Sequence, residues 1–256
     1  MRSELAANGT INAEHKGRED WPDCDVHSSS DEYAKRFHGS VGEFFLDRQA
    51  KLLRKALPFG HGFTALDVGG GHGQLVSVLK DSGAATTILG SAPVCEHRVK
   101  QYVEQGICSF KAGNFYNLPF PDKSFDVVIC FRQIAHVEDP NKLIQELCRV
   151  SKNRVIIDYP PLCSFNVFYP VLYPLKQWIE KSTRTFNIFR KSQLKKEFRQ
   201  EGFHIIRCEH QFFVPMGVHR LFQSGTLSTA IEMAFMYIGL TNLFGSPVVL
   251  TLENLL

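Results

Sequence analysis

The sequence lacks several patterns that identify common classes of protein. Its seven cysteines include no C-x-x-C pair, so neither a zinc site nor a disulfide framework is indicated. The longest apolar stretch, 230–244, contains Glu232 and Asn242, which disfavours a membrane span. Residues 1–30 are polar and have no apolar core of the kind found in secretory signals, so we expect a disordered tail there. Together these absences favour a cytoplasmic protein with reduced thiols and no metal site.

A strong charge imbalance is also missing. The chain carries 29 Lys and Arg against 26 Asp and Glu, a net charge of +3, which is too mild to indicate a nucleic-acid binder. Its 256 residues, 44% of them hydrophobic, are enough for one α/β domain with additions. Basic residues gather between Lys176 and Arg199, as on a solvated helix or on a surface that attracts an anionic headgroup or phosphorylated substrate.

Short apolar runs alternate with helical periods along most of the chain. A helical segment from Asp31 to just before Pro58 comes first, with one apolar face. Alternation of strand and helix then predicts a parallel sheet covered on both faces. We expect strands at 63–68, 86–89, 125–130, 155–158, 204–213 and 247–252, and helices at 74–80, 93–105, 140–150 and 227–240. Asp139 before Pro140 marks the start of the helix at 140–150, and Ser192 and Gly202 frame a further helix.

The most informative segment is TALDVGGGHGQ, at 64–74. Asp67 ends a predicted strand, and Gly69, Gly71 and Gly73 form the turn that opens a helix, where backbone can approach a ligand closely. The phosphate-binding spacing G-x-x-x-x-G-K-[ST] is absent, and the dinucleotide spacing G-x-G-x-x-G fails because position 74 is glutamine. The remaining spacing, D-x-G-x-G-x-G, resembles the first motif of class I methyltransferases.

The resemblance extends downstream, through GNFYNLPFPDKSFDVVIC at 113–130 and FRQIAHVEDPNKLIQELCRV at 131–150. Both segments resemble the methyltransferase type 11 family, in the family's order, and the likeness covers about 60–210. It implies a Rossmann-like fold and S-adenosylmethionine as the cofactor. The residues that would bind this cofactor are Asp67, Gly69, Gly71 and Gly73 at its methionine part, Gly90 and Ser91 at its ribose, Asn114 and Phe115 at its adenine, and Arg132. A core aromatic is the alternative for Phe115.

One departure from the family concerns the ribose. The family usually has an acid at the end of the second strand, whereas this chain reads TTILGSAPV and has no Asp or Glu between Asp81 and Glu96. Gly90 takes the acid's place, and Ser91 is the nearby side chain that can bond a hydroxyl. An aspartate introduced at Gly90 is therefore expected to strengthen cofactor binding. The missing acid also argues against a nicotinamide dinucleotide.

Two side chains are candidates for a catalytic role, because ligands bind at the carboxyl ends of strands in open α/β sheets. His136 and Tyr159 follow the strands expected at 125–130 and 155–158, and histidine is the better base since it titrates near neutrality. A structural histidine that braces the loop before Asp139 is an equal alternative. Arg132 would steer an acidic acceptor, or be a solvated charge at the end of a strand.

We therefore predict an α/β protein with a Rossmann-like class I methyltransferase fold, built on a seven-stranded, mostly parallel sheet with helices on both faces. The domain would cover 31–256, with an N-terminal helical cap and an acceptor-side lid around 159–190 and 214–245. It would transfer a methyl group from S-adenosylmethionine to a small-molecule or lipid-like acceptor by in-line displacement, with peripheral membrane contact possible and no nucleic acid. The alternative is a catalytically degenerate fold that binds a ligand or a partner.

Overall fold

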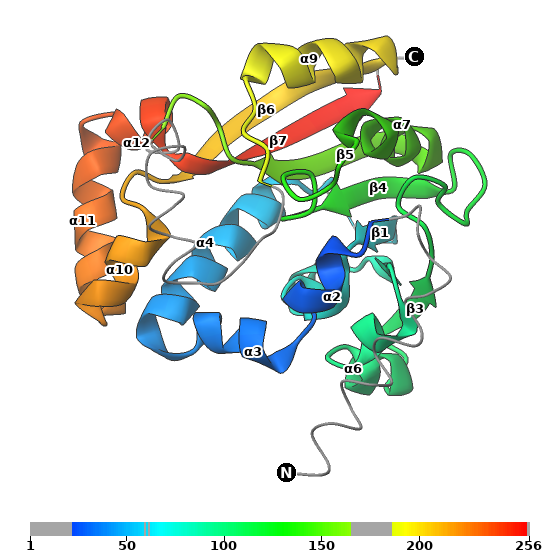
Figure 1. Ribbon diagram of the computed structural model, residues 1–256, viewed down its shortest axis with the longest axis horizontal. Coiled ribbons are helices and arrows are strands. Elements are labelled where there is room, and N and C mark those ends of the chain that lie inside the picture. Colours follow the sequence, from blue (N-terminus) through cyan, green and yellow to red (C-terminus); the bar gives the residue numbers. More distant parts are fainter. Residues whose placement is uncertain (1–21, 59, 61, 165–185, 255–256) are drawn as a thin grey trace.

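The architecture is taken from a computed structural model, which describes residues 22–58, 60, 62–164 and 186–254. Its centre is one seven-stranded sheet in the order β3-β2-β1-β4-β5-β7-β6 (Figure 1). Only β7 is antiparallel to its neighbours, β5 and β6, which confirms the predicted sheet. The strands are β1 (Thr64–Val68), β2 (Ala85–Gly90), β3 (Cys108–Ala112), β4 (Phe125–Cys130), β5 (Ser151–Tyr159), β6 (Phe203–Phe212) and β7 (Ser246–Asn254).

Helices cover both faces of this sheet, because the central strands are apolar on both sides. On one face, Leu52 and Leu53 of α4 (Gly39–Ala56) and Leu79 of α5 (Val76–Asp81) pack against the sheet. On the other, Leu147 of α7 (Pro140–Val150) and Phe198 of α9 (Lys191–Gln200) do so. The two layers of apolar side chains bury the centre of the sheet and leave its carboxyl edge for polar groups.

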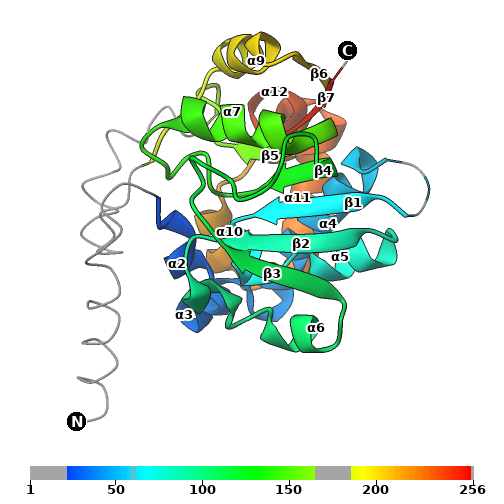
Figure 2. The same ribbon diagram turned by 90° about the vertical axis from the view of Figure 1, so that its right-hand side faces the viewer.

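The N-terminal part differs from the prediction. The expected tail, 1–30, extends too far, since Cys24–Ser28 forms the helix α2, whose Cys24 and Asp25 are buried. Figure 2 shows α2 at the carboxyl ends of the strands, and it contacts η3 (Gly70–His72), the 3-10 turn after β1. Residues 1–21 lie outside the described part. Two short elements, α3 (Asp31–Ala34) and η2 (Lys35–Phe37), then lead into α4.

The structure confirms one helix boundary in detail and corrects another. Asp139 accepts hydrogen bonds from the backbone N–H groups of Asn141 and Lys142, as expected of a capping residue before proline. The helix expected at 93–105 is instead two short pieces, η4 (Pro93–Glu96) and α6 (Lys100–Glu104). Bonds of the 3-10 type, such as Cys95 N to Ala92 O, tighten the first piece.

The last third of the chain adds a helical extension to the carboxyl edge of the sheet. The helices α10 (Met216–Phe222), α11 (Gly225–Tyr237) and α12 (Leu240–Phe244) connect β6 to β7 (Figure 1). Of these, α11 packs against α4, and α12 packs against α11 and β6. They correspond to the second half of the expected acceptor-side lid. Most of its first half, 165–185, lies outside the described residues, as do Lys176, Lys181 and Arg184 of the basic segment.

Candidate active site

The glycine turn after β1 needs glycine at three positions. Gly69 and Gly73 have φ of 76° and 74°, in the left-handed region where a side chain is strained. A Cβ at Gly71 would lie 2.5 Å from both the Ser29 Oγ and the Cys95 carbonyl oxygen. The turn is thus bounded by α2 on one side and by η4 on the other.

Buried polar groups beside the turn fit a cationic, hydrogen-bonding ligand such as S-adenosylmethionine. Asp67 is 1% exposed, and neither of its carboxylate oxygens accepts a hydrogen bond from the described residues. Burial raises the pKa of Asp67 to about 7, although the positive charge of Arg132 opposes this shift. Burial lowers the pKa of His72 to about 3, and its Nε2 also has no partner among the described residues. A polar ligand would relieve the cost of these unpaired groups.

The end of β2 does not have room for the acid that the family usually carries. A Cβ at Gly90 would lie 2.6 Å from the Cys95 Cβ and 2.9 Å from the Phe110 Cζ. The expectation that an aspartate at Gly90 would strengthen binding is therefore wrong on steric grounds. Ser91 is 2% exposed, and its backbone N–H donates to the Asp25 carboxylate at 2.9 Å.

Gly90→Asp is now expected to destabilise the fold, because an overpacked core site typically costs about 1–3 kcal/mol. The melting temperature should fall, and affinity for S-adenosylhomocysteine should not improve. Gly217→Ala is a matched control, since a Cβ there meets nothing within 4 Å. A Gly90→Asp protein that melts like the control and binds the ligand more tightly would refute the steric argument.

The two residues expected to contact adenine already have partners within the protein. Asn114 follows β3 and uses its Oδ1 to accept the backbone N–H of Tyr116 at 2.8 Å, which fixes the turn. Phe115 is fully buried in the same cluster of core side chains as Leu66 and Val68. The structure therefore places Phe115 where the core alternative put it, and its contact with adenine stays a prediction.

Arg132 joins the glycine turn to the opposite wall of the site. Its guanidinium donates to the Gln74 Oε1 at 2.5 Å and to the Gln49 Oε1, and it lies 4.5 Å from the centroid of the Phe37 ring. Its backbone has φ of 64°, and its N–H donates to the Asp158 Oδ1 at 2.5 Å. These contacts show that Arg132 is not a solvated charge at the end of a strand.

A cavity of about 530 Å³ opens beside Arg132, at the carboxyl ends of β4, β5 and β6. Both catalytic candidates, His136 and Tyr159, line it, and α4 and α10 form its other walls. The remaining predicted site residues, from Asp67 to Phe115, do not line this cavity. Aromatic rings are the commonest lining group: Tyr33, Phe37, Phe45, Tyr159, Phe186, Phe212, Phe213 and Phe244. Three arginines, Arg36, Arg132 and Arg220, line the cavity as well.

The surroundings of the two candidates differ. His136 is half-buried, and the centroid of its ring lies 5.8 Å from that of Phe186. Tyr159 is 2% exposed, and burial raises the pKa of its phenol well above the usual range. The Tyr159 hydroxyl therefore stays protonated at neutral pH and can donate a hydrogen bond, which leaves His136 as the better base.

The sequence interpretation missed two acids that shape this cavity. Asp158 lines it, and burial raises the pKa of its carboxyl to about 6 against the favourable bond from Arg132. Its position at the end of a predicted strand was a usable signal. Glu232 is 4% exposed and accepts the backbone N–H groups of Phe213 and Val214 as well as the His219 Nε2. No local pattern indicates that role, because the partners come from β6 and α10.

Comparisons with known proteins agree with this geometry. Residues 66–157 match the family model described as a methyltransferase domain. An uncharacterised protein of Methanocaldococcus jannaschii is 26% identical over 188 residues, which cover 72% of this chain and 73% of the relative. The demethylmenaquinone methyltransferase of Chlamydia pneumoniae is 25% identical over 174 residues, 60% of this chain and 76% of that protein.

Among solved structures, the fold resembles that of a putative methyltransferase in complex with the Trm112 methyltransferase activator of Haloferax volcanii. The TM-score is 0.65 at 20% identity, over 92% of this chain and 99% of the other. The sheet, the glycine turn and the site at the carboxyl edge define a Rossmann-like methyltransferase fold. Residues 66–157 therefore form a methyltransferase domain, and S-adenosylmethionine is the cofactor of the class I methyltransferases whose fold the chain shares.

Within the described residues, no helix is long and apolar enough to cross a membrane. The same part of the chain contains no group of three or more His, Cys, Asp or Glu side chains placed to hold a metal ion. All seven cysteines are free thiols, and five of them are buried.

Proposed function

We propose that this methyltransferase acts on a small, largely apolar acceptor, aromatic or lipid-like, that binds in the cavity beside Arg132. One observation carries the proposal: Arg132 bonds Gln74, directly after the glycine turn, and Gln49, in the cavity wall. A methyl donor at the turn and an acceptor in the cavity would therefore be neighbours. The name of the Chlamydia pneumoniae relative, a demethylmenaquinone methyltransferase, supports a small-molecule acceptor.

The lining of the cavity supports the apolar character of the acceptor. Eight aromatic rings line it, and such rings bind flat or apolar groups without the need for many polar partners. Polar side chains also line it, among them Arg36, Arg132, His136, Asp158 and Arg220. An acceptor with a polar, methylatable group on an apolar body matches this mixed lining.

Methyl transfer from S-adenosylmethionine depends more on alignment of the reacting atoms than on a strong acid or base. S-adenosylmethionine supplies a methyl group that its sulfonium sulfur already activates. Residues of the cavity would hold the acceptor atom in line with that methyl group and exclude water. His136 would take the proton of an acceptor that must lose one, and Tyr159 would donate a hydrogen bond that orients it.

A bulky side chain at an exposed lining residue tests the proposal. Gly217 lines the cavity and is exposed, and a Cβ there meets nothing within 4 Å, so Gly217→Phe would add a ring at the cavity surface without overpacking the fold. We expect transfer of labelled methyl from S-adenosylmethionine into the solvent-extractable small molecules of a cell extract to fall roughly tenfold or more, the effect of losing about 1.4 kcal/mol of acceptor binding. Affinity for S-adenosylhomocysteine should stay unchanged.

Gly217→Ala serves as the control and should retain full transfer, because a methyl group leaves most of the cavity open. Label that enters protein or nucleic acid instead of small molecules would contradict the proposed acceptor class. Equal transfer by Gly217→Phe and Gly217→Ala would show that the acceptor binds elsewhere.

A further inference from the structure

The end of β2 carries no carboxylate that could bind the ribose of the cofactor. A ribose with two free hydroxyls is commonly held by a carboxylate that accepts their hydrogen bonds. Cys95 and Phe110 fill the space that a side chain at Gly90 would need. A carboxylate for the ribose must therefore come from another element of the chain.

Asp25 of α2 places a carboxylate at this point. Its Oδ2 accepts the backbone N–H of Ser91, the residue after Gly90, at 2.9 Å. The side chain is 0% exposed, and its Oδ1 accepts no hydrogen bond of normal geometry from the described residues. The side chains of Ser91 and Cys95 also hydrogen-bond to the carboxyl group. Asp25 thus places a buried carboxyl group at the carboxyl end of β2, where its Oδ1 can accept further hydrogen bonds.

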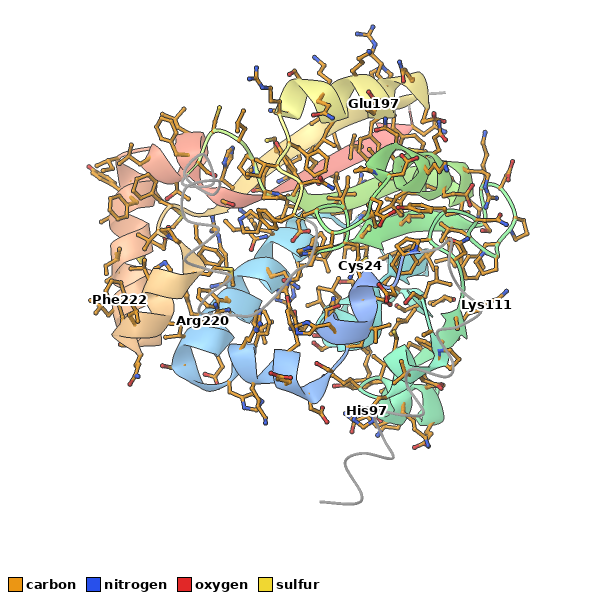
Figure 3. All side chains as sticks on the ribbon, in the orientation of Figure 1. Cys24, His97, Lys111, Glu197, Arg220 and Phe222 are labelled. Atoms are coloured by element: carbon orange, nitrogen blue, oxygen red, sulfur yellow. The ribbon has the colours of Figure 1, made fainter. Side chains whose placement is uncertain are left out.

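A chain of bonds fixes α2 against the turn. The Cys24 thiol donates to the Gln133 Oε1 at 3.1 Å, and the Gln133 Nε2 donates to the Gly69 carbonyl oxygen at 3.2 Å. Gly69 in turn donates its N–H to the Leu89 carbonyl oxygen of β2 at 2.8 Å. Figure 3 shows Cys24 where α2 meets the centre of the molecule, far from Arg220 and Phe222 on α10. Asp25 therefore belongs to the cofactor side of the site and not to the acceptor cavity.

We propose that Asp25 is the ribose-binding acid of this protein, supplied by the N-terminal helix α2 in place of the acid usually found at the end of β2. The inference rests on the cofactor assignment made above. It implies that α2 is part of the cofactor site, as its cover and as the source of one binding group.

The electrostatics of Asp25 fit this role. Burial raises the pKa of the Asp25 carboxyl, against the opposing hydrogen bonds from Ser91. A buried carboxylate is costly, and two further hydroxyl donors would lower that cost. Asp67, the other buried acid nearby, lies in β1 beneath the glycine turn, so it faces the methionine side of the site.

Calorimetric titration of the purified full chain tests the proposal with two probes, S-adenosylhomocysteine and its 2′,3′-dideoxy analogue. We expect the native chain to bind the hydroxylated probe roughly tenfold or more tightly than the analogue, the size of one charged hydrogen bond. Asp25→Asn should lose a similar factor for S-adenosylhomocysteine and little for the analogue. The control Asp31→Asn, at an exposed carboxylate paired with Arg98, should match the native chain.

The outcomes separate the alternatives. Equal loss for both probes would assign Asp25 a structural role, and tighter binding by Asp25→Asn would make α2 a plug that competes with the cofactor; either result overturns the proposal. If Asp25→Asn does not fold, the native chain alone still tests the proposal. Equal affinity of the native chain for the two probes also overturns the proposal. Failure of the native chain to bind S-adenosylhomocysteine at all would overturn the cofactor assignment together with this inference.

Discussion

Glu232→Ala is expected to lower the melting temperature by on the order of 10 °C, because removal of one partner of a buried charged network costs about 3–5 kcal/mol. Its two oxygens accept hydrogen bonds from the backbone of Phe213 and Val214, at 2.9 and 2.8 Å, and from the His219 Nε2 at 3.0 Å. All these donors are left without an acceptor in the variant. Glu232 thereby ties α11 to the end of β6 and to α10.

The loss should extend to the acceptor cavity. Phe213 lines the cavity, and so do Met216 and Gly217 of α10, so detachment of these elements removes one wall. Differential scanning calorimetry gives the melting temperature, and methyl transfer into small molecules gives the activity. Glu43→Ala, at an exposed position of α4, is the matched control. If the two variants melt alike, the network around Glu232 does not hold the α10–α12 extension in place.

His136→Gln is expected to lower turnover about 100-fold, the scale on which general bases contribute, if the acceptor must lose a proton. Affinity for S-adenosylhomocysteine should change little, because His136 lines the acceptor cavity and not the glycine turn. In the native chain, activity should fall on the acid side of neutrality, since only the neutral imidazole accepts a proton. That acidic limb of the pH profile should be absent from the variant.

The same variant separates catalysis from bracing of the loop. A histidine that only supports the segment before Asp139 would, when replaced, lower the melting temperature and cofactor affinity together and leave the shape of the pH profile intact. His38→Gln, at an exposed position before α4, is the control for both readouts. Full turnover by His136→Gln would leave methyl transfer by alignment alone as the mechanism.

Most of the sheet was predictable, because each of its elements carries a local signal. Apolar runs mark the strands, Asp139 before proline marks the start of α7, and the glycines after Asp67 mark the turn. The strand β3 (Cys108–Ala112) was harder to recognise, since it lies at the edge of the sheet and only its first residue, Cys108, is buried. Local patterns therefore fixed the order of strands and helices better than their ends.

The site was less predictable, since its parts come from distant segments. The helix α2 has only five residues. Asp25 is bonded to Ser91, 66 positions further along the chain, and Cys24 is bonded to Gln133, 109 positions further along. The burial of α2 depends on these distant contacts. The acceptor cavity likewise combines α4 with the ends of β5 and β6. No periodicity within a segment encodes such contacts, which explains why Asp25 was assigned to a tail and Asp158 only to a strand.

Titration of the native chain with S-adenosylhomocysteine and with NAD in a calorimeter tests the central claim most directly. The fold, the glycine turn and the unpaired Asp67 carboxylate predict saturable binding of one S-adenosylhomocysteine per chain and no binding of NAD. Absence of binding by S-adenosylhomocysteine, or a preference for NAD, would contradict the assignment of this site to methyl transfer.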